Sequence, residues 1–133
     1  DRGLVGSEMC IRDSLNWIPA RLTWLLLSVA ALIHPRCSGK SAFKVGWNYH
    51  DGVASPNAGW CEATAAGALQ VRLCGPIWRE GELTSEHWLG PAHYRQGGTV
   101  QDIRQTAELT LIATALFASA GLVLLQDPFL PVG

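Results

Sequence analysis

Two apolar runs, separated by a long stretch of mixed polarity, set the pattern of the chain. The first extends from Leu15 to Ile33, and its uncharged core, residues 22–33, has 12 residues. A helix needs about 20 residues to cross a bilayer, so the run is long enough only if residues 15–20 join it and Arg21 extends its charge towards the polar surface. We predict a transmembrane helix over 15–33; the apolar region of a signal peptide is the alternative.

The second run is the clearer candidate for a membrane span. Residues 109–125 are 17 positions without a charge, between two acidic residues and ahead of a proline. As a core element of a soluble protein, a helix that is apolar on every face would need a larger protein around it. We predict a second transmembrane helix over 106–126, preceded by Thr99 as N-cap with Asp102 in capping-box position, and a short tail over 127–133.

Between the two runs lies a segment of turns with one helical stretch of small residues. Ser55 and Asn57 favour a helix N-terminus, whereas the Gly75-Pro76 pair ends a helix. Many residues between them are small, so we predict a helix over about 58–73 that allows close approach of another helix or of a flat ligand. The predicted fold is therefore all-α, with two transmembrane helices that flank a helical and looped segment at 34–105.

Residues 1–14 do not fit this pattern. They are polar without periodicity, and the string VGSEMCIRDS resembles translated read-through of a sequencing adapter. We exclude this leader from the fold as non-native or disordered, as one excludes a cloning scar. We therefore expect that the natural N-terminal portion of the chain is missing.

Composition and charge support a membrane protein. Hydrophobic residues make up 48% of the chain and charged residues 16%, against about a quarter charged in typical soluble domains, and the mean hydropathy is +0.14. The net charge of −1 gives no basis for nucleic-acid binding. Segment 34–105 holds seven of the ten Lys and Arg residues, so the positive-inside rule places it on the cytoplasmic side of a cell membrane.

Short motifs alone identify no reaction. The four cysteines show no C-x-x-C spacing and have no histidine at metal-ligand intervals, so we predict neither a metal site nor a disulfide framework. The sequence also lacks phosphate-binding-loop and nucleophile-elbow motifs. Any assignment of chemistry therefore depends on longer blocks of sequence.

Three such blocks resemble one enzyme family, in the family's order. Residues 55–69 read SPNAGWCEATAAGAL and are followed by V-x-L and a Gly-Pro pair. Residues 16–22 read NWIPARL, and the segment from Glu82 to Gly90, with Asp102-Ile103 after it, resembles the family's tail region. Together the blocks resemble adenosylcobinamide-phosphate synthases, which are polytopic membrane proteins of cobalamin biosynthesis, and they correspond to the C-terminal part of such an enzyme.

The resemblance implies a reaction, its substrates and its cofactors. Such an enzyme joins adenosylcobyric acid to aminopropanol or its phosphate, in an ATP-dependent amide ligation that gives adenosylcobinamide or its phosphate. The corrinoid and the amino alcohol would be substrates, and ATP and Mg²⁺ would be co-substrates. The lipid bilayer and the missing N-terminal portion would be structural partners. We expect the fragment to be inactive alone.

The resemblance also implies site residues. The candidate catalytic residues are Glu62, Asp51 and Arg21: either carboxylate would act as a base or Mg²⁺ ligand, and Arg21 would contact an anion. The candidate substrate-binding residues are Asn16, Ser55, Asn57, Gly59, Trp60, Gly67 and Arg72. Asp51 has an alternative role as a cap of the turn, and Arg21 as an interfacial anchor.

Two positions depart from the family pattern. The family more often has glycine where this chain has Gln70 and Cys74. A larger side chain at Gln70 would stand where close packing is expected, which weakens the inference of full activity but not of kinship.

Two other functions stay open at this stage. A noncatalytic two-span membrane anchor or interaction protein would have the same hydropathy, but it has no reason to keep the SPNAGW block between its spans. A secreted protein with one cleaved signal peptide would require residues 109–125 to be a core helix.

Overall fold

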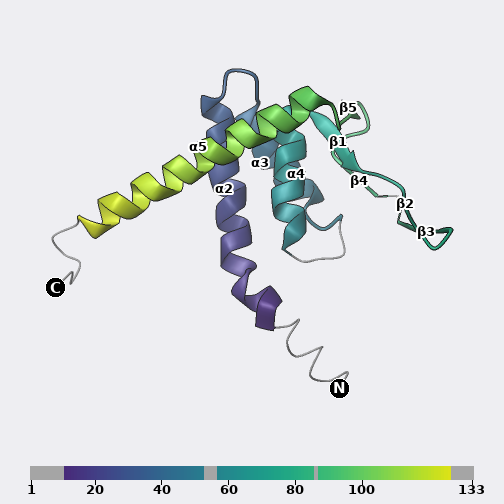
Figure 1. The fold of residues 1–133 in the computed structure, drawn as a ribbon, viewed down its shortest axis with the longest axis horizontal. Coiled ribbons are helices and arrows are strands. Elements are labelled where there is room, and N and C mark those ends of the chain that lie inside the picture. The colour runs from purple at the N-terminus through teal and green to yellow at the C-terminus, as the bar shows by residue number, and fades with distance from the viewer. Residues whose placement is uncertain (1–10, 53–56, 86, 127–133) are drawn as a thin grey trace.

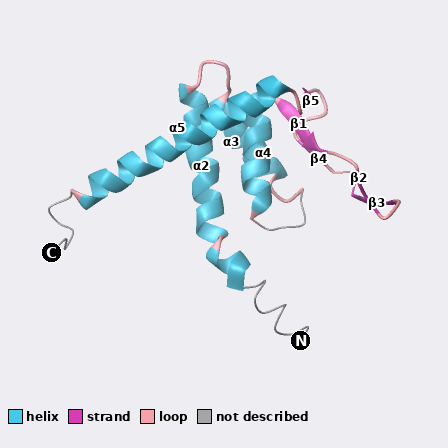
Figure 2. Ribbon diagram, in the orientation of Figure 1, coloured by secondary structure: helices cyan, strands magenta, loops and turns pink. Residues whose placement is uncertain are grey.

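The computed structural model describes residues 11–52, 57–85 and 87–126. Its helices are α2 (Trp17–Ile33), α3 (Gly39–Tyr49), α4 (Ala58–Leu69) and α5 (Val100–Leu125). Its strands are β1 (Val71–Cys74), β2 (Ile77–Arg79), β3 (Glu82–Ser85), β4 (Trp88–Leu89) and β5 (Arg95–Gln96). Helices dominate the described chain, and the strands form only a small patch beside them (Figure 2).

α2, α3 and α4 pack together, and α5 crosses them. α2, α3 and α4 contact one another, while α5 runs across α2 and α4 and its C-terminal half extends away from the other helices (Figure 1). His34, at the end of α2, makes a side-chain contact with α5. Its Nδ1 accepts the Arg36 backbone N–H, so Nε2 carries the proton and donates to Glu108 Oε2 of α5 at 2.6 Å.

Small residues let α3 and α4 approach closely. A Cβ added at Gly67 of α4 would overlap the carbonyl oxygen of Ser41 and lie 2.8 Å from Val45 Cβ, both on α3. A Cβ at Gly46 of α3 would lie 2.5 Å from Cδ1 of Trp24 on α2. Because α3 already fills this space, the part of α4 around Gly67 packs against a helix and leaves no room there for a flat ligand.

The end of α4 corrects two predictions. The expected helix over 58–73 ends at Leu69, and Gln70 adopts a left-handed conformation with φ 56° and ψ 47°. The next residues form β1, which pairs antiparallel with β4 and parallel with β5, while β2 and β3 form a separate hairpin. The all-α prediction is therefore confirmed for most of the described chain but wrong for residues 71–96.

The backbone is left-handed at Gln70 and Cys74, which explains why glycine is expected at these two positions. Gln70 and Cys74 have φ values of 56° and 71°, a region that glycine enters freely and that costs other residues roughly 1 kcal/mol. The Gln70 side chain is exposed, so backbone conformation rather than close packing disfavours a larger residue there.

We therefore expect Gln70→Gly to raise the free energy of unfolding by about 0.5–1 kcal/mol, because it relieves the left-handed strain at the end of α4. Thermal unfolding followed by the helical circular dichroism signal in detergent measures this. Gln70→Ala is the matched control, since it shortens the side chain but keeps the Cβ. An equal gain in both variants would contradict the explanation.

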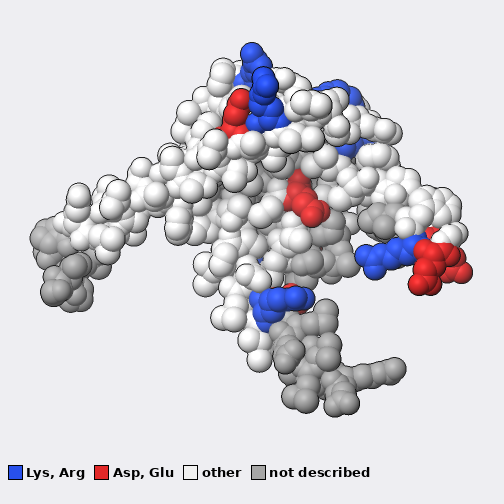
Figure 3. Space-filling view, in the orientation of Figure 1, with Lys and Arg blue, Asp and Glu red and all other residues white. Residues whose placement is uncertain are grey.

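The membrane prediction is supported for one helix. Of the helices in the described ranges, α5 alone is both long and apolar enough to cross a membrane; α2 is apolar but has 17 residues. The extended half of α5 shows no charged atom on the face in Figure 3. Two membrane spans, as predicted from the sequence, are thus not shown.

The start of α5 is held by a dense polar cluster, as its sequence predicts. Thr99 is the N-cap and forms a capping box with Asp102. Asp102 is 4% exposed, accepts the backbone N–H groups of Gly98 and Thr99, and makes a bidentate pair with Arg95 at 2.5 and 3.1 Å. This cluster fixes the joint between β5 and α5.

Candidate functional site

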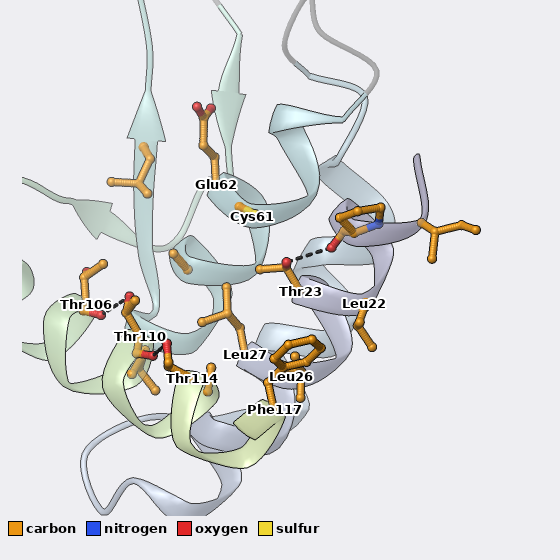
Figure 4. A pocket seen from close by; sticks show the side chains of 16 residues that line it. Leu22, Thr23, Leu26, Leu27, Cys61, Glu62, Thr106, Thr110, Thr114 and Phe117 are labelled. Carbon is orange, nitrogen blue, oxygen red and sulfur yellow. Dashed lines mark hydrogen bonds between the residues drawn. The ribbon is translucent and has the colours of Figure 1, made fainter. Parts of the chain in front are cut away.

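A cavity of about 750 Å³ lies where α2, α4 and α5 meet. Its walls come from three separate parts of the chain, with β1 at one side (Figure 4). The lining side chains labelled in Figure 4 are Leu22, Thr23, Leu26 and Leu27 of α2, Cys61 and Glu62 of α4, and Thr106, Thr110, Thr114 and Phe117 of α5. Glu62 is the sole charged residue among those that line it.

The threonines of α5 do not make the cavity polar. Thr106, Thr110 and Thr114 follow one another at a spacing of four, which places them on one face of the helix. Each hydroxyl donates at 2.8 Å to the carbonyl oxygen four residues earlier. Because these donors are satisfied within the helix, the cavity is apolar except near Glu62.

Glu62 lies next to two thiols. The Cys74 thiol donates to Glu62 Oε2 at 3.7 Å, and Cys61 is its neighbour in the chain. Burial, and secondly the charge of Glu62, raises the pKa of the Cys74 thiol. Burial also raises the pKa of the Cys61 thiol. A thiol with a raised pKa stays protonated at neutral pH, so neither cysteine is activated as a nucleophile.

A smaller and more polar cavity of about 370 Å³ adjoins the first. The two share Pro19, Thr23 and Cys61 as lining residues. The polar residues that line the smaller cavity are Arg12, Asp13, Asn16, Thr23 and Asn57. The Asn57 side chain donates from Nδ2 to the carbonyl oxygen of Asp13 at 2.7 Å. Residues 12 and 13 are thus part of this site, although we excluded 1–14 from the fold.

The opposite side of α4 faces an aromatic cluster, which we define as Trp24, Phe43, Trp47, His50 and Trp60. Trp60 is 3% exposed, and its ring stacks on His50 with centroids 3.9 Å apart. Trp24 lies 5.0 Å from Trp60 and stacks with Phe43 at 4.6 Å. The cluster joins α2, α3 and α4.

Arg21 belongs to the side of α4 that bears the aromatic cluster. Its guanidinium lies 3.8 Å from the ring centre of Trp17 and 5.0 Å from that of Trp60. Its Nη1 donates to the Trp17 carbonyl oxygen at 2.9 Å. Cation–π contacts of this kind place the charge next to aromatic faces, away from the cavity that Glu62 lines.

Comparison with known proteins identifies the family. A model of the CobD/CbiB protein family matches residues 11–110. The chain belongs to the CobD/CbiB family. This confirms the family resemblance of the sequence blocks, and the match includes residues 11–14 of the excluded leader.

Curated CobD/CbiB proteins are similar over most of this chain. The cobalamin biosynthesis protein CobD of Citrobacter koseri is 44% identical over 114 residues, and CbiB of Salmonella typhi is 41% identical over the same length. CobD of Photorhabdus laumondii is 43% identical. Each match covers 86% of this chain and 34% of the relative, so the chain spans about a third of the length of these relatives. No solved structure matches the chain.

The structure divides the predicted site residues of this CobD/CbiB chain between two faces of α4. Glu62 lines the large cavity, and Asn16 and Asn57 line the smaller one beside it. Arg21 and Trp60 lie together on the opposite side. Asn57 and Trp60, both from the SPNAGW block, therefore face different parts of the structure.

The remaining predicted residues lie elsewhere. Gly67 packs against Ser41 of α3 and is not among the residues that line the two cavities. Arg72 lies on β1 with its guanidinium 4.6 Å from the ring centre of Trp88. Asp51 is exposed just beyond α3, Gly59 is buried in the first turn of α4, and Ser55 lies outside the described residues.

The sequence analysis missed Thr23, Cys61 and the α5 threonines as cavity residues. The spacing of four among Thr106, Thr110 and Thr114 is visible in the sequence, but nothing there shows that they face α4. Their role follows from the crossing of α5 over α2, which brings together residues about 90 positions apart.

The large cavity alone does not form a complete ATP·Mg²⁺ site. A nucleotide site needs basic groups or backbone amides at the phosphates, and Mg²⁺ takes one or two carboxylates with phosphate and water. Glu62 is a single carboxylate in a cavity with no basic lining residue. Within the described ranges there is also no group of three metal-ligating side chains. The large cavity by itself therefore lacks the basic groups and paired carboxylates that ATP and Mg²⁺ need, whereas the adjoining smaller cavity is lined by one basic and one acidic residue, Arg12 and Asp13.

Proposed function

We propose that this chain is part of a cobalamin biosynthesis enzyme that joins adenosylcobyric acid to aminopropanol or its phosphate through an amide bond. The observation that carries the proposal is the similarity, over 86% of the chain, to curated proteins named for cobalamin biosynthesis. ATP and Mg²⁺ would activate the carboxyl group, with phosphate as the leaving group, and other parts of the longer family protein would hold them.

In this proposal Glu62 is the base. An amine attacks a carboxyl carbon only when it is neutral, so a proton must leave its nitrogen. Glu62 is the single carboxylate at a cavity that is otherwise apolar, and a cationic ammonium group would be attracted to it. The proton would pass from the amine nitrogen to a Glu62 oxygen, and the Cys74 thiol would hold the carboxylate in place by its hydrogen bond.

The side chains of Asn16 and Asn57 would bind polar groups of the substrate. They line the cavity that adjoins the Glu62 cavity, and amide groups offer both donors and acceptors. We do not place Arg21 and Trp60 in the same site, because they lie across α4. Asp51, Ser55, Gly59 and Arg72 stay candidates for contacts with the rest of the longer protein.

We further propose that α5 crosses the inner membrane and that residues 34–105 lie in the cytoplasm. The length and apolar character of α5 support the first point, and the Lys and Arg bias of the segment supports the second. The multi-pass topology of the longer protein would then place the amide-forming site next to cytoplasmic ATP.

Genetic complementation tests the proposed function. The full open reading frame that contains this chain is expressed in a bacterium that lacks its own synthase and is fed cobyric acid. We expect cobalamin-dependent growth. No growth from a well-expressed, membrane-inserted protein would contradict the enzyme proposal and favour the noncatalytic anchor, which the hydropathy pattern also fits.

A further inference from the structure

The outer face of α3 has an unusual composition. Lys40, Phe43, Lys44 and Trp47 are exposed together with the neutral Asn48, and the four recur at spacings of three and four, so they form one stripe along the helix. Phe43 is 46% exposed and Trp47 is 59% exposed. The opposite face of α3, including Ala42, Val45 and Gly46, is buried. We call the four exposed residues the basic-aromatic face.

The charge of this face is entirely positive. No Asp or Glu occurs in α3, and neither Lys40 nor Lys44 makes an ion pair within the described ranges. Arg36, just before the helix, is also exposed. Two unpaired ammonium groups, one helical turn apart beside two exposed aromatic rings, complement a surface that is both anionic and partly apolar.

The neighbouring helix continues the face with apolar side chains. Phe43 and Trp47 both pack against Trp24 of α2, with ring centres 4.6 and 5.6 Å away. α2 also exposes the apolar residues Leu25, Val29 and Leu32, whereas its exposed residues Ile18 and Leu22 line the large cavity. The two helices together therefore expose basic, aromatic and aliphatic side chains, in increasing order of apolar character.

This order matches the layers of a membrane surface. Lipid phosphates lie outermost and attract lysine, indole rings prefer the interface, and aliphatic side chains prefer the acyl region. An acidic protein partner would satisfy the lysines but leaves the aliphatic stripe of α2 unexplained. We propose that the basic-aromatic face lies on the membrane and binds anionic phospholipid headgroups through Lys40 and Lys44. The proposal does not depend on the enzymatic function.

Lipid selectivity measured by spin-label electron paramagnetic resonance tests the proposal. The protein from the full open reading frame that contains this chain is reconstituted into phosphatidylcholine vesicles that carry trace spin-labelled phosphatidylglycerol or phosphatidylcholine. The fraction of label immobilised by the protein gives the preference between headgroups. At low salt we expect a clear preference for phosphatidylglycerol that falls roughly fivefold per lysine removed, and so is abolished in Lys40→Gln/Lys44→Gln. High salt should also weaken it.

Arg79→Gln is the matched control for Lys44→Gln, since it removes one exposed positive charge from the β2–β3 hairpin instead. We expect it to leave the preference unchanged. Both lysines are exposed, and helical circular dichroism checks that each variant folds. The proposal is overturned if the natural chain shows no preference, as it would if protein covered this face, or if Arg79→Gln lowers the preference as much as Lys44→Gln. Since no corrinoid is present, neither result depends on the complementation assay.

Discussion

Replacing Gly67 by alanine will destabilise the fold by about 2–3 kcal/mol, although the same change in an ordinary helix position stabilises by up to about 1 kcal/mol. The sign reverses because the new Cβ would overlap the carbonyl oxygen of Ser41 and press on Val45. The obstacle is partly the backbone of α3, so no side-chain rotation relieves it. The two helices would have to separate, which opens the core between them.

Denaturant or thermal unfolding in detergent, followed by helical circular dichroism, measures this change. Gly121→Ala is the matched control, because Gly121 also lies within a helix but a Cβ there meets nothing within 4 Å. We expect Gly121→Ala to be neutral or slightly stabilising. If Gly67→Ala behaved like Gly121→Ala, the close contact of α3 and α4 would be wrong.

Replacing Glu62 by glutamine in the full-length protein will slow amide formation by about 10²- to 10⁴-fold, the usual range for loss of a general base. Glutamine keeps the size of the side chain and can still accept from the Cys74 thiol, but it cannot take a proton from an amine. The fold should therefore be unchanged. The measurement is the rate of formation of the amide product from labelled amino alcohol in membranes, at equal protein levels.

Glu80→Gln serves as the control for Glu62→Gln, since it removes one exposed carboxylate at the turn between β2 and β3. We expect normal product formation from it. Unchanged product formation by Glu62→Gln would remove Glu62 from the mechanism while leaving the family membership intact. Loss of activity in both variants would point to a general effect of charge instead.

The sequence predicts those parts of the fold that local interactions determine. Thr99 and Asp102 are three residues apart, and their capping box is present at the start of α5. The apolar run of α2 is helical to Ile33, as expected. In both cases the residues that decide the structure are neighbours in the chain, so pattern and propensity suffice.

The strands and the end of α4 depend on distant partners, so the sequence does not reveal them. β1 has four residues and pairs with β4 and β5, which follow it by more than ten positions. Such short strands form because their partners are present, not because of their own propensity. Gln70 ends α4 in a left-handed conformation without the glycine that would have marked the position.

In the candidate site, too, the sequence predicts the local features but not those that depend on distant residues. The sequence block that contains Glu62 is recognisable, but the cavity beside Glu62 needs Thr106 and Phe117 of α5. Likewise, the small residues of α4 predict close approach, yet they do not say whether a ligand or a helix approaches. The structure places α3 there, against Gly67.

The division of α4 into a cavity side and a packed side constrains how its sequence can change. Successive helix residues turn by about 100°, so one residue inserted after Trp60 would rotate Cys61 and Glu62 away from the cavity and Gly67 away from Ser41. The composition would hardly change, but the helix would lose both its cavity lining and its packing against α3. In α4 the number of residues is therefore constrained more strictly than the identity of many of them. Insertions and deletions should be tolerated in the β2–β3 hairpin instead.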